Sequence, residues 1–264
     1  MKTHDLMPFL TNLTEKAGEI LTSYFNGKFT IERKDTSPLG VDIVTDADRA
    51  SEEAILTEIR REFPGHDILT EETETVITGS EWLWIVDPLD GTVNFAHGFP
   101  HFCISIAVAQ FNELVCGTIY DPLKKERFWA ARDLGAYMNE SRLKVSTAQR
   151  LNKSLVATGF PYDKAYSPIN NVSEFSRVIT KIQGIRRAGS AALDLAYVAA
   201  GRLDGFWELK LKPWDQAAGM LLVQEADGRV SDRFGSSMDY RSDNIVATNG
   251  AIHAELLEAL TPAK

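Results

Sequence analysis

The nine residues 84–92 read Trp84-Ile85-Val86-Asp87-Pro88-Leu89-Asp90-Gly91-Thr92 and indicate the fold class more clearly than any other stretch. Their apolar start predicts a buried strand that ends in two carboxylates. Ligands of α/β proteins gather at the carboxyl ends of strands, where Asp87 and Asp90 would emerge together. Both would ionise comfortably only with a cation between them. Hard oxygen ligands favour Mg²⁺, Mn²⁺ or Ca²⁺ over zinc, and the alternative is an ordinary Pro-containing turn.

Three further segments supply carboxylates that would join the same site. One short apolar run ends in Glu71 and Glu72, and another ends near Asp48 just before a helical pattern. Asp215 falls in the first turn of a later predicted helix. Each has an ordinary alternative, which is a solvated loop, a capping box or an acid at a helix N-terminus. Their occurrence beside the strand-end pair favours a cation site.

Length and composition set the scale of the molecule. A chain of 264 residues with 44% hydrophobic content can bury a substantial core, as one large domain or as two closely packed halves. A polar stretch after Asn139 is the predicted boundary between halves of residues 1–145 and 146–264 within one compact unit. No apolar stretch approaches the roughly 18–20 residues that span a bilayer, and the start lacks a secretory pattern. Cytoplasmic residence without membrane attachment is therefore expected.

Charge and cysteine content exclude several function classes. The net charge of −9 argues against direct nucleic-acid binding, which usually leaves a basic footprint. It would also repel a phosphorylated substrate unless bound cations reversed the local field. Cys103 and Cys116 lie in strand-like segments, where each is expected to serve as a small buried hydrophobe.

Hydrophobic periodicity predicts alternating helical and sheet layers. Helices are expected over residues 6–24, 47–63, 172–182, 190–200, 214–225 and 252–260. Strands are expected over 154–158, 204–211 and 244–248 and within the strand-rich region 82–131, where 114–120 and 127–131 form a hairpin. Gly201 and Gly228 are expected to close the helices that precede them. Small residues at 217–219 favour close packing of one helix against its neighbours.

Three segments together resemble the signatures of the inositol monophosphatase family. They are Glu71-Glu72, the 87–92 segment and Trp214-Asp215-Gln216-Ala217-Ala218-Gly219. The resemblance covers nearly the whole chain, including residues 44–48, 189–194 and 199–205, and residues 186–190 are most similar to the bacterial branch. Val93 stands where many relatives have Thr, and Asp227 replaces a common Gly. The resemblance implies an α/β fold, a five-layered α-β-α-β-α sandwich with the active site between its halves.

The same resemblance implies a Mg²⁺-dependent phosphomonoester hydrolase. Glu71 and Asp87 would hold one metal ion with help from the Leu89 carbonyl, while Asp87, Asp90 and Asp215 would hold a second. A third, weaker ion on Glu71 is also implied. Mn²⁺ would substitute for Mg²⁺, and Ca²⁺ or Li⁺ would inhibit.

Residues for catalysis and substrate binding carry over from the matching motifs. Thr92 would orient the attacking water with Asp48 as the proton acceptor behind it, although Thr92 also fits a helix N-cap. Gly91 and Thr92 would present backbone N–H groups to the phosphate. Substrate contacts are expected from Asp90 and from three residues further along the chain: Ser190, Ala191 and Glu208. An exposed strand acid is the alternative for Glu208.

Several substrates and partners fit the resemblance. Inositol 1-phosphate leads, and relatives hydrolyse fructose 1,6-bisphosphate or nucleotide phosphates. Some bacterial members act as binding factors in transcription complexes, and Lys181, Arg186 and Arg187 could form a basic patch for such partners. A homodimer is also implied. His97 and His101 are expected to be loop or packing residues, and residues 34–40 form either a flap over the site or an inert loop.

Overall fold

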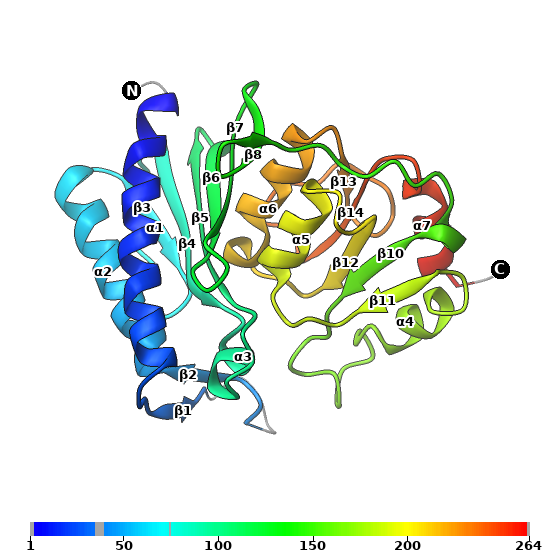
Figure 1. Cartoon of the computed structure of the whole chain (residues 1–264), viewed down its shortest axis with the longest axis horizontal. Helices are drawn as coiled ribbons and strands as arrows, with labels where there is room; N and C mark the ends of the chain where they lie inside the picture. Colours follow the sequence, from blue (N-terminus) through cyan, green and yellow to red (C-terminus); the bar gives the residue numbers. More distant parts are fainter. Residues whose placement is uncertain (1–2, 35–39, 74, 263–264) are drawn as a thin grey trace.

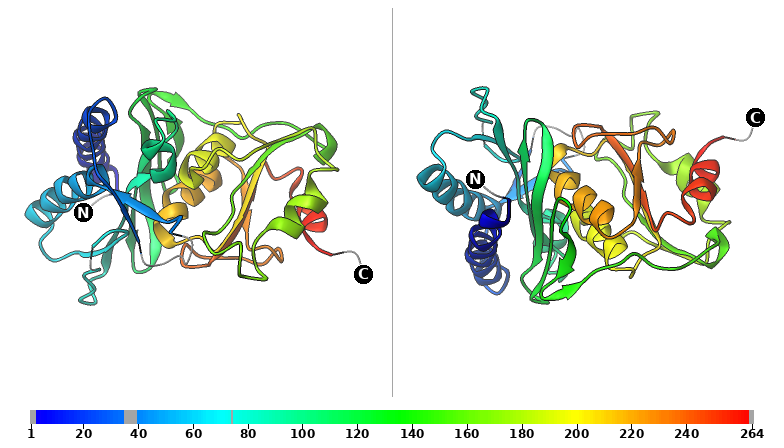
Figure 2. Two further views of the ribbon diagram at one scale, coloured as in Figure 1. Left: turned by 90° about the horizontal axis from the view of Figure 1, so that it is seen from below. Right: turned by 90° about the horizontal axis from the view of Figure 1, so that it is seen from above.

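The computed structural model describes residues 3–34, 40–73 and 75–262, and it has the predicted five layers (Figures 1 and 2). Two helices cover one face of a large sheet, two helices lie between that sheet and a smaller one, and two short helices cover the far face. The α-β-α-β-α sandwich expected from the resemblance is therefore confirmed. Across the described residues, no helix combines the length and apolarity needed to cross a bilayer.

The outer helices are α1 (Thr3–Phe25) and α2 (Asp46–Glu62). They pack on a seven-stranded sheet of order β3-β4-β5-β6-β7-β8-β9. Its strands are β3 (Asp67–Thr70), β4 (Trp82–Asp90), β5 (Cys103–Gln110), β6 (Glu113–Asp121), β7 (Glu126–Ala131), β8 (Gly135–Met138) and β9 (Ser141–Arg142). The predicted hairpin is confirmed as β6 and β7, which pair antiparallel. Cys103 and Cys116 are both buried as free thiols, as expected.

The pairing of β3 with β4 places the acidic segments side by side. These two strands run parallel, with Thr70 opposite Val86. Glu71 and Asp87, the next residue of each chain segment, therefore lie side by side toward the carboxyl ends of the strands. The pairing of β4 with β5 shifts register between Asp87 and Asp90. Pro88 lies inside this shift and has no N–H to donate to a ladder, which is why a bulge is accommodated there.

The smaller sheet has the order β11-β10-β12-β14-β13. Its strands are β10 (Leu155–Thr158), β11 (Gly184–Arg186), β12 (Gly205–Leu209), β13 (Arg229–Ser231) and β14 (Asn244–Thr248). Between the sheets lie α5 (Ala191–Ala199) and α6 (Pro213–Glu225), and α4 (Val172–Val178) and α7 (His253–Leu260) cover the outer face. The remaining short elements are β1 (Ile31–Arg33), β2 (Ile43–Thr45), α3 (Thr92–Ala96) and η1 (Leu151–Lys153).

Two helix ends differ from the sequence prediction. The helix expected to reach residue 182 ends at Val178, because the chain tightens there into a turn closed by the Lys181 N–H on the Val178 carbonyl at 2.8 Å. Gly201 closes α5 in a left-handed conformation, as predicted. After α6, however, Asp227 and not Gly228 takes the left-handed conformation, and the Gly228 N–H caps the Val223 carbonyl at 2.9 Å.

The helices between the sheets pack closely because α6 carries small residues. Ala217 and Ala218 are fully buried in a core cluster that also takes in Ile85 from the large sheet and Phe206 from the small one. A Cβ atom on Gly219 would lie 2.4 Å from the Leu195 Cβ on α5, which is far inside van der Waals contact. The contact between α5 and α6 therefore requires glycine at this position.

Gly219→Ala is expected to destabilise the protein although alanine is the better helix former. The gain in helix propensity is about 1 kcal/mol, and overpacking costs about 1–3 kcal/mol. A clash as close as that with Leu195 belongs at the upper end of this range. Urea unfolding monitored by circular dichroism measures the difference. Gly65→Ala is the control, because no atom lies within 4 Å of its added Cβ. Equal stability of the two variants would contradict the packing argument.

Candidate active site

The predicted acidic residues converge from separate elements. Asp87 and Asp90 lie on β4, Glu71 follows β3, and Asp215 lies in the first turn of α6. Burial raises the pKa of Asp87 well above its ordinary value, and repulsion from Glu71, Asp90 and Asp215 raises it further. Burial also raises the pKa of Asp215 well above its ordinary value, with Glu71 and Asp90 adding to the shift. The four carboxylates therefore lie within electrostatic reach of one another.

Asp90 is held by the start of α5. The Ser190 hydroxyl donates to Asp90 Oδ2 at 2.5 Å, and the Ala192 N–H donates to the same oxygen at 2.8 Å. Ser190 is also the N-cap of α5 and accepts the Leu193 N–H. Burial raises the pKa of Asp90 to about 6 in spite of these hydrogen bonds. The contacts join the small-sheet half of the chain to the strand that carries Asp87 and Asp90.

Thr92 and Asp48 are in direct contact. The Thr92 hydroxyl lies 2.9 Å from Asp48 Oδ1 and 3.1 Å from the Leu89 carbonyl, and it donates to them. Asp48 is buried and also closes the predicted capping box of α2 by accepting the Thr45 N–H at 2.8 Å. Burial raises the pKa of Asp48 to about 6. The capping box and the contact with Thr92 thus use opposite oxygens of one carboxylate.

The backbone around Thr92 differs slightly from the alternative drawn from sequence. Gly91, not Thr92, is the N-cap of α3, and Thr92 is the first residue of that short helix. Gly91 has φ +98°, and a Cβ there would lie 3.0 Å from the His101 carbonyl oxygen. Both the left-handed conformation and the close approach require glycine.

Lys34 binds the paired glutamates. Its ammonium lies 2.9 Å from Glu71 Oε1 and 2.6 Å from Glu72 Oε1. Burial alone would lower the pKa of Lys34, but the two carboxylates outweigh that effect and raise it. Burial raises the pKa of Glu72 to about 7, and repulsion from Glu71 adds to the shift. Residues 35–39 of the segment 34–40, expected to be either a flap or an inert loop, lie outside the described residues.

The donor set fits a hard divalent cation, although the carboxylates are not closed around one. Within residues 3–34, 40–73 and 75–262, no group of three or more His, Cys, Asp or Glu side chains stands in a ligating arrangement. Each carboxylate has its own partner: Asp87 accepts the Leu89 N–H at 3.0 Å and Asp215 the Lys212 N–H at 2.6 Å. Repulsion between these oxygen donors raises their pKa values. Bound Mg²⁺ or Mn²⁺ would relieve that repulsion.

Glu208 is not an exposed strand acid, so that alternative is wrong. Its side chain is partly buried on β12, and a Cβ placed on Gly159 would lie 2.0 Å from Glu208 Oε1. Burial raises the pKa of Glu208 to about 8, while the Arg187 guanidinium lowers it and Asp90 raises it. Glu208 therefore faces the same acidic region as Asp90.

The histidines near the acidic segment agree with the expectation of loop or packing residues, with His97 exposed at the end of α3 and His101 packed inside. His101 is buried, its ring lies 6.1 Å from that of Tyr197, and its Nε2 has no hydrogen-bond partner. Burial lowers the pKa of His101 to about 4, so the ring is neutral near pH 7. Trp214 packs against the central core cluster, and its carbonyl accepts the Ser105 hydroxyl at 3.3 Å.

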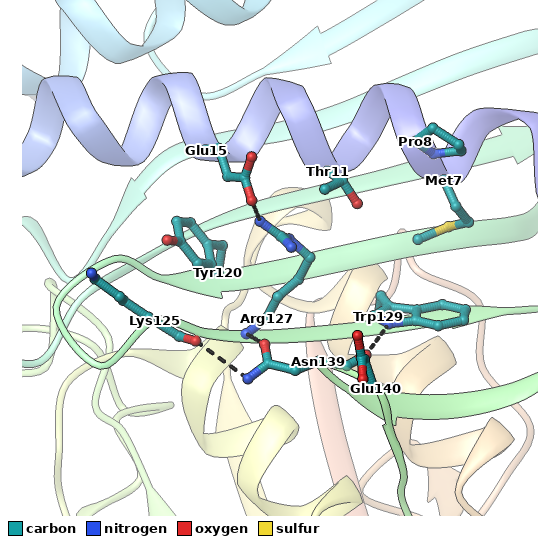
Figure 3. A pocket seen from close by; sticks show the side chains of 10 residues that line it. All are labelled: Met7, Pro8, Thr11, Glu15, Tyr120, Lys125, Arg127, Trp129, Asn139 and Glu140. Carbon is teal, nitrogen blue, oxygen red and sulfur yellow. Dashed lines mark hydrogen bonds and ion pairs between the residues drawn. The ribbon is translucent and has the colours of Figure 1, made fainter.

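A separate cavity of ≈ 640 Å³ opens between α1 and strands β6 and β7 (Figure 3). Arg127 crosses it to Glu15 at 2.6 Å, and the Trp129 indole donates to the Asn139 carbonyl at 2.9 Å. None of the predicted ligands or substrate-binding residues lines this cavity. The acidic site is therefore distinct from it.

Sequence reasoning missed two residues that hold the site together. Ser51 and Glu52 are fully buried on α2, three and four residues after Asp48. Their spacing puts all three on one helical face. The signal available in the sequence is this spacing, which places Glu52 on the same helical face as Asp48. A glutamate on a buried face needs hydrogen-bond partners.

Comparison with known proteins agrees with this architecture. The sequence profile of the inositol monophosphatase family matches residues 3–263. Inositol-1-monophosphatase of Synechocystis sp. is 47% identical over 220 residues, covering 83% of this chain and 77% of that protein. Nus factor SuhB of Salmonella typhimurium is 41% identical over 255 residues, covering 96% and 95% of the two chains. The crystal structure of the extragenic suppressor protein SuhB from Bartonella henselae superposes with a TM-score of 0.91, at 40% identity over 98% of this chain and 100% of that one.

These similarities first define the class of protein: the chain is a phosphatase, of a kind that generally depends on metal ions. It belongs to the inositol monophosphatase family.

The acidic site is expected to make the metal-free protein less stable at high pH. A carboxyl group with a raised folded-state pKa binds its proton more tightly when folded, so stability is lost as the pH rises through that pKa. The loss from Asp90, whose pKa is about 6, is nearly complete by about pH 6.5. Glu72 and Glu208, with pKa values of about 7 and about 8, extend the loss from there to about pH 8. The buried His101 and His253 act oppositely, and mainly below this window.

Thermal melting in chelator and in Mg²⁺ measures this effect. The melting temperature in chelator should fall from pH 6.5 to pH 8.5, and Mg²⁺ should restore more stability at the higher pH. At about 100 times its Kd, each independently bound ion contributes about 2.7 kcal/mol. A melting temperature in chelator that rises across this window would contradict the account.

Proposed function

We propose that the protein is a Mg²⁺-dependent phosphomonoester hydrolase that acts on inositol 1-phosphate. The observation that carries the proposal is the convergence of Asp87, Asp90 and Asp215 with Glu71, a set of acids whose mutual repulsion bound cations would relieve. The relative named inositol-1-monophosphatase supports the choice of substrate. We also propose that the protein is a cytoplasmic homodimer. Within each chain, the halves formed by residues 1–145 and 146–264 would flank the site.

The ligand assignments follow from the donor set. Glu71 and Asp87, with the Leu89 carbonyl, would hold one Mg²⁺; Asp87, Asp90 and Asp215 would hold a second, and Glu71 a weaker third. Mn²⁺ would substitute, whereas Ca²⁺ or Li⁺ would inhibit. When bound, Mg²⁺ neutralises phosphoryl charge and lowers the pKa of a water nucleophile.

Thr92 and Asp48 would direct the attacking water. Because the Thr92 hydroxyl donates to Asp48, its oxygen lone pair is free to accept a hydrogen from water and so to orient it. Burial and the fixed hydrogen bonds to Thr45 hold the Asp48 carboxylate in one orientation. Asp48 would then accept a proton passed through Thr92.

The substrate would lie between the two halves of the chain. Backbone N–H groups of Gly91 and Thr92 would bind the phosphate, and glycine at position 91 allows the left-handed turn that precedes α3. Asp90, Ser190, Ala191 and Glu208 would bind the polyol. Glu208, with a pKa raised to about 8 by burial, is largely protonated near pH 7 and can therefore donate as well as accept a ring hydrogen bond.

A second role is favoured by the relatives named Nus factor SuhB. The transcription-complex role implied by the resemblance would place protein partners on this chain beside its catalytic activity. Lys181, Arg186 and Arg187 are exposed and could meet such partners. The Arg187 guanidinium also lowers the pKa of Glu208, so Arg187 lies close to the proposed substrate-binding region.

Phosphate release from a substrate panel tests the proposal. Inositol 1-phosphate, fructose 1,6-bisphosphate, nucleotide monophosphates and glycerol 2-phosphate are compared with and without Mg²⁺. We expect Mg²⁺-dependent turnover led by inositol 1-phosphate. Asp90→Asn should lower kcat by about 10²-fold or more, because the lost charge weakens metal binding and transition-state stabilisation.

Other outcomes would redirect the proposal. A different leading substrate would keep the chemistry but overturn the assignment to inositol 1-phosphate. Near-normal activity of Asp90→Asn would overturn the metal assignment. No turnover on any substrate, with folded and metal-loaded protein, would leave the transcription role as the function to pursue.

A further inference from the structure

Helix α2 contacts each segment of the large-sheet half that carries predicted catalytic groups. Asp48, Ser51 and Glu52 lie on one face of this helix and are all buried. Asp48 accepts the Thr92 hydroxyl at 2.9 Å, and the Ser51 hydroxyl donates to the Pro88 carbonyl at 2.8 Å. One rigid helix thus holds both ends of the 87–92 segment.

Glu52 holds the remaining segment, the loop that follows β3. Its Oε1 atom accepts three hydrogen bonds, from the Thr70 hydroxyl and from the N–H groups of Glu72 and Thr73 at 3.2 Å and 3.3 Å. These donors come directly before and after Glu71. The residues on both sides of Glu71 are therefore tied to one buried oxygen atom, Thr70 through its hydroxyl and the two following residues through their backbone N–H groups.

The electrostatics of this loop make such a restraint necessary. Glu71 and Glu72 repel each other, and Glu71 also repels Asp87. Lys34 offsets the repulsion from the solvent side by binding both glutamates. Glu52 acts from the core side on the backbone, so its restraint persists when Glu71 exchanges Lys34 for another cation.

We propose that Glu52 is a positioning residue for Glu71, and that α2, through Asp48, Ser51 and Glu52, sets the spacing between the Glu71 loop and the 87–92 segment. The inference rests on the proposed function, because it assigns the spacing to a metal ion held jointly by Glu71 and Asp87. Glu52 does not ligate the ion. It acts through the backbone, as outer-shell partners do when they orient the ligands of a metal.

The test separates positioning from simple loss of stability. We compare wild type, Glu52→Ala and Glu52→Gln by Mn²⁺ titration calorimetry and by the Mg²⁺ concentration that gives half-maximal activity. Outer-shell mutations cost about 10–100-fold in metal affinity, so Glu52→Ala should weaken Mn²⁺ binding and raise the Mg²⁺ requirement by about 10-fold or more. At saturating Mg²⁺, kcat should recover to within about threefold. Glu52→Gln keeps the accepting Oε1 and should bind Mn²⁺ within about threefold of wild type.

Glu225 offers a matched control. Its carboxylate also holds a turn, by accepting the Asp133 N–H at 3.0 Å and the Gly135 N–H at 2.8 Å at the far end of α6. Glu225→Ala should leave Mn²⁺ affinity unchanged whatever it costs in stability. If Glu52→Ala does not fold, Thr70→Val removes the hydroxyl donor alone and should weaken Mn²⁺ binding, whereas Thr70→Ser, which retains the hydroxyl, should not.

The outcomes distinguish this inference from the function on which it rests. If wild type binds Mn²⁺ and both Glu52→Ala and Thr70→Val bind it with the same affinity, the positioning role alone is overturned. Equal weakening by Glu225→Ala also overturns it, because the effect would then be general. Wild type that neither binds Mn²⁺ nor responds to Mg²⁺ overturns the proposed function instead.

Discussion

Mutual repulsion among closely placed carboxylates dominates the energetics of this protein's active-site region. Burial raises the pKa of Asp87 and of Asp215 well above their ordinary values, and each lies within the field of Glu71 and Asp90. Burying such charges together costs several kcal/mol per ion unless they are paired or protonated. The surrounding elements therefore do two things: they hold the acids in place, and they leave the acids dependent on protons or cations.

The holding contacts come from both halves of the chain. The start of α5 grips Asp90, α2 binds the segments on either side of it, and Lys34 binds the glutamate pair. Close packing of α5 against α6 at Gly219 brings the first turns of both helices to the same region. An enzyme that needs a divalent cation would gain stability from the same ion that it needs for activity.

Much of this arrangement could be predicted from the sequence. The long periodic helices, the hairpin of β6 and β7 and the layered fold are confirmed, because their patterns and the family motifs are strong. Short strands such as β11 escaped prediction, since three residues carry no measurable period. The left-handed conformation of Asp227 was not predicted, because the neighbouring glycine is the usual residue at such a position. Only the backbone dihedral angles show which of the two residues adopts it.

The contacts that support the site were harder to predict than its acids. The sequence places acids at strand ends, but it does not show that Glu52 Oε1 accepts donors 18 to 21 positions away or that Lys34 reaches Glu71. Such pairings depend on how α2 lies against β3 and β4. The roles assigned to the ligands and to the substrate-binding residues stay predictions.

Anomalous diffraction from crystals soaked in Mn²⁺ would show whether the four acids hold metal ions. We expect two anomalous peaks that share Asp87, one beside Glu71 and the Leu89 carbonyl and one beside Asp90 and Asp215, with the Lys34 ammonium displaced from Glu71. Mn²⁺ at saturating concentration that leaves no peak among these carboxylates, or that binds only elsewhere on the molecule, would contradict this expectation.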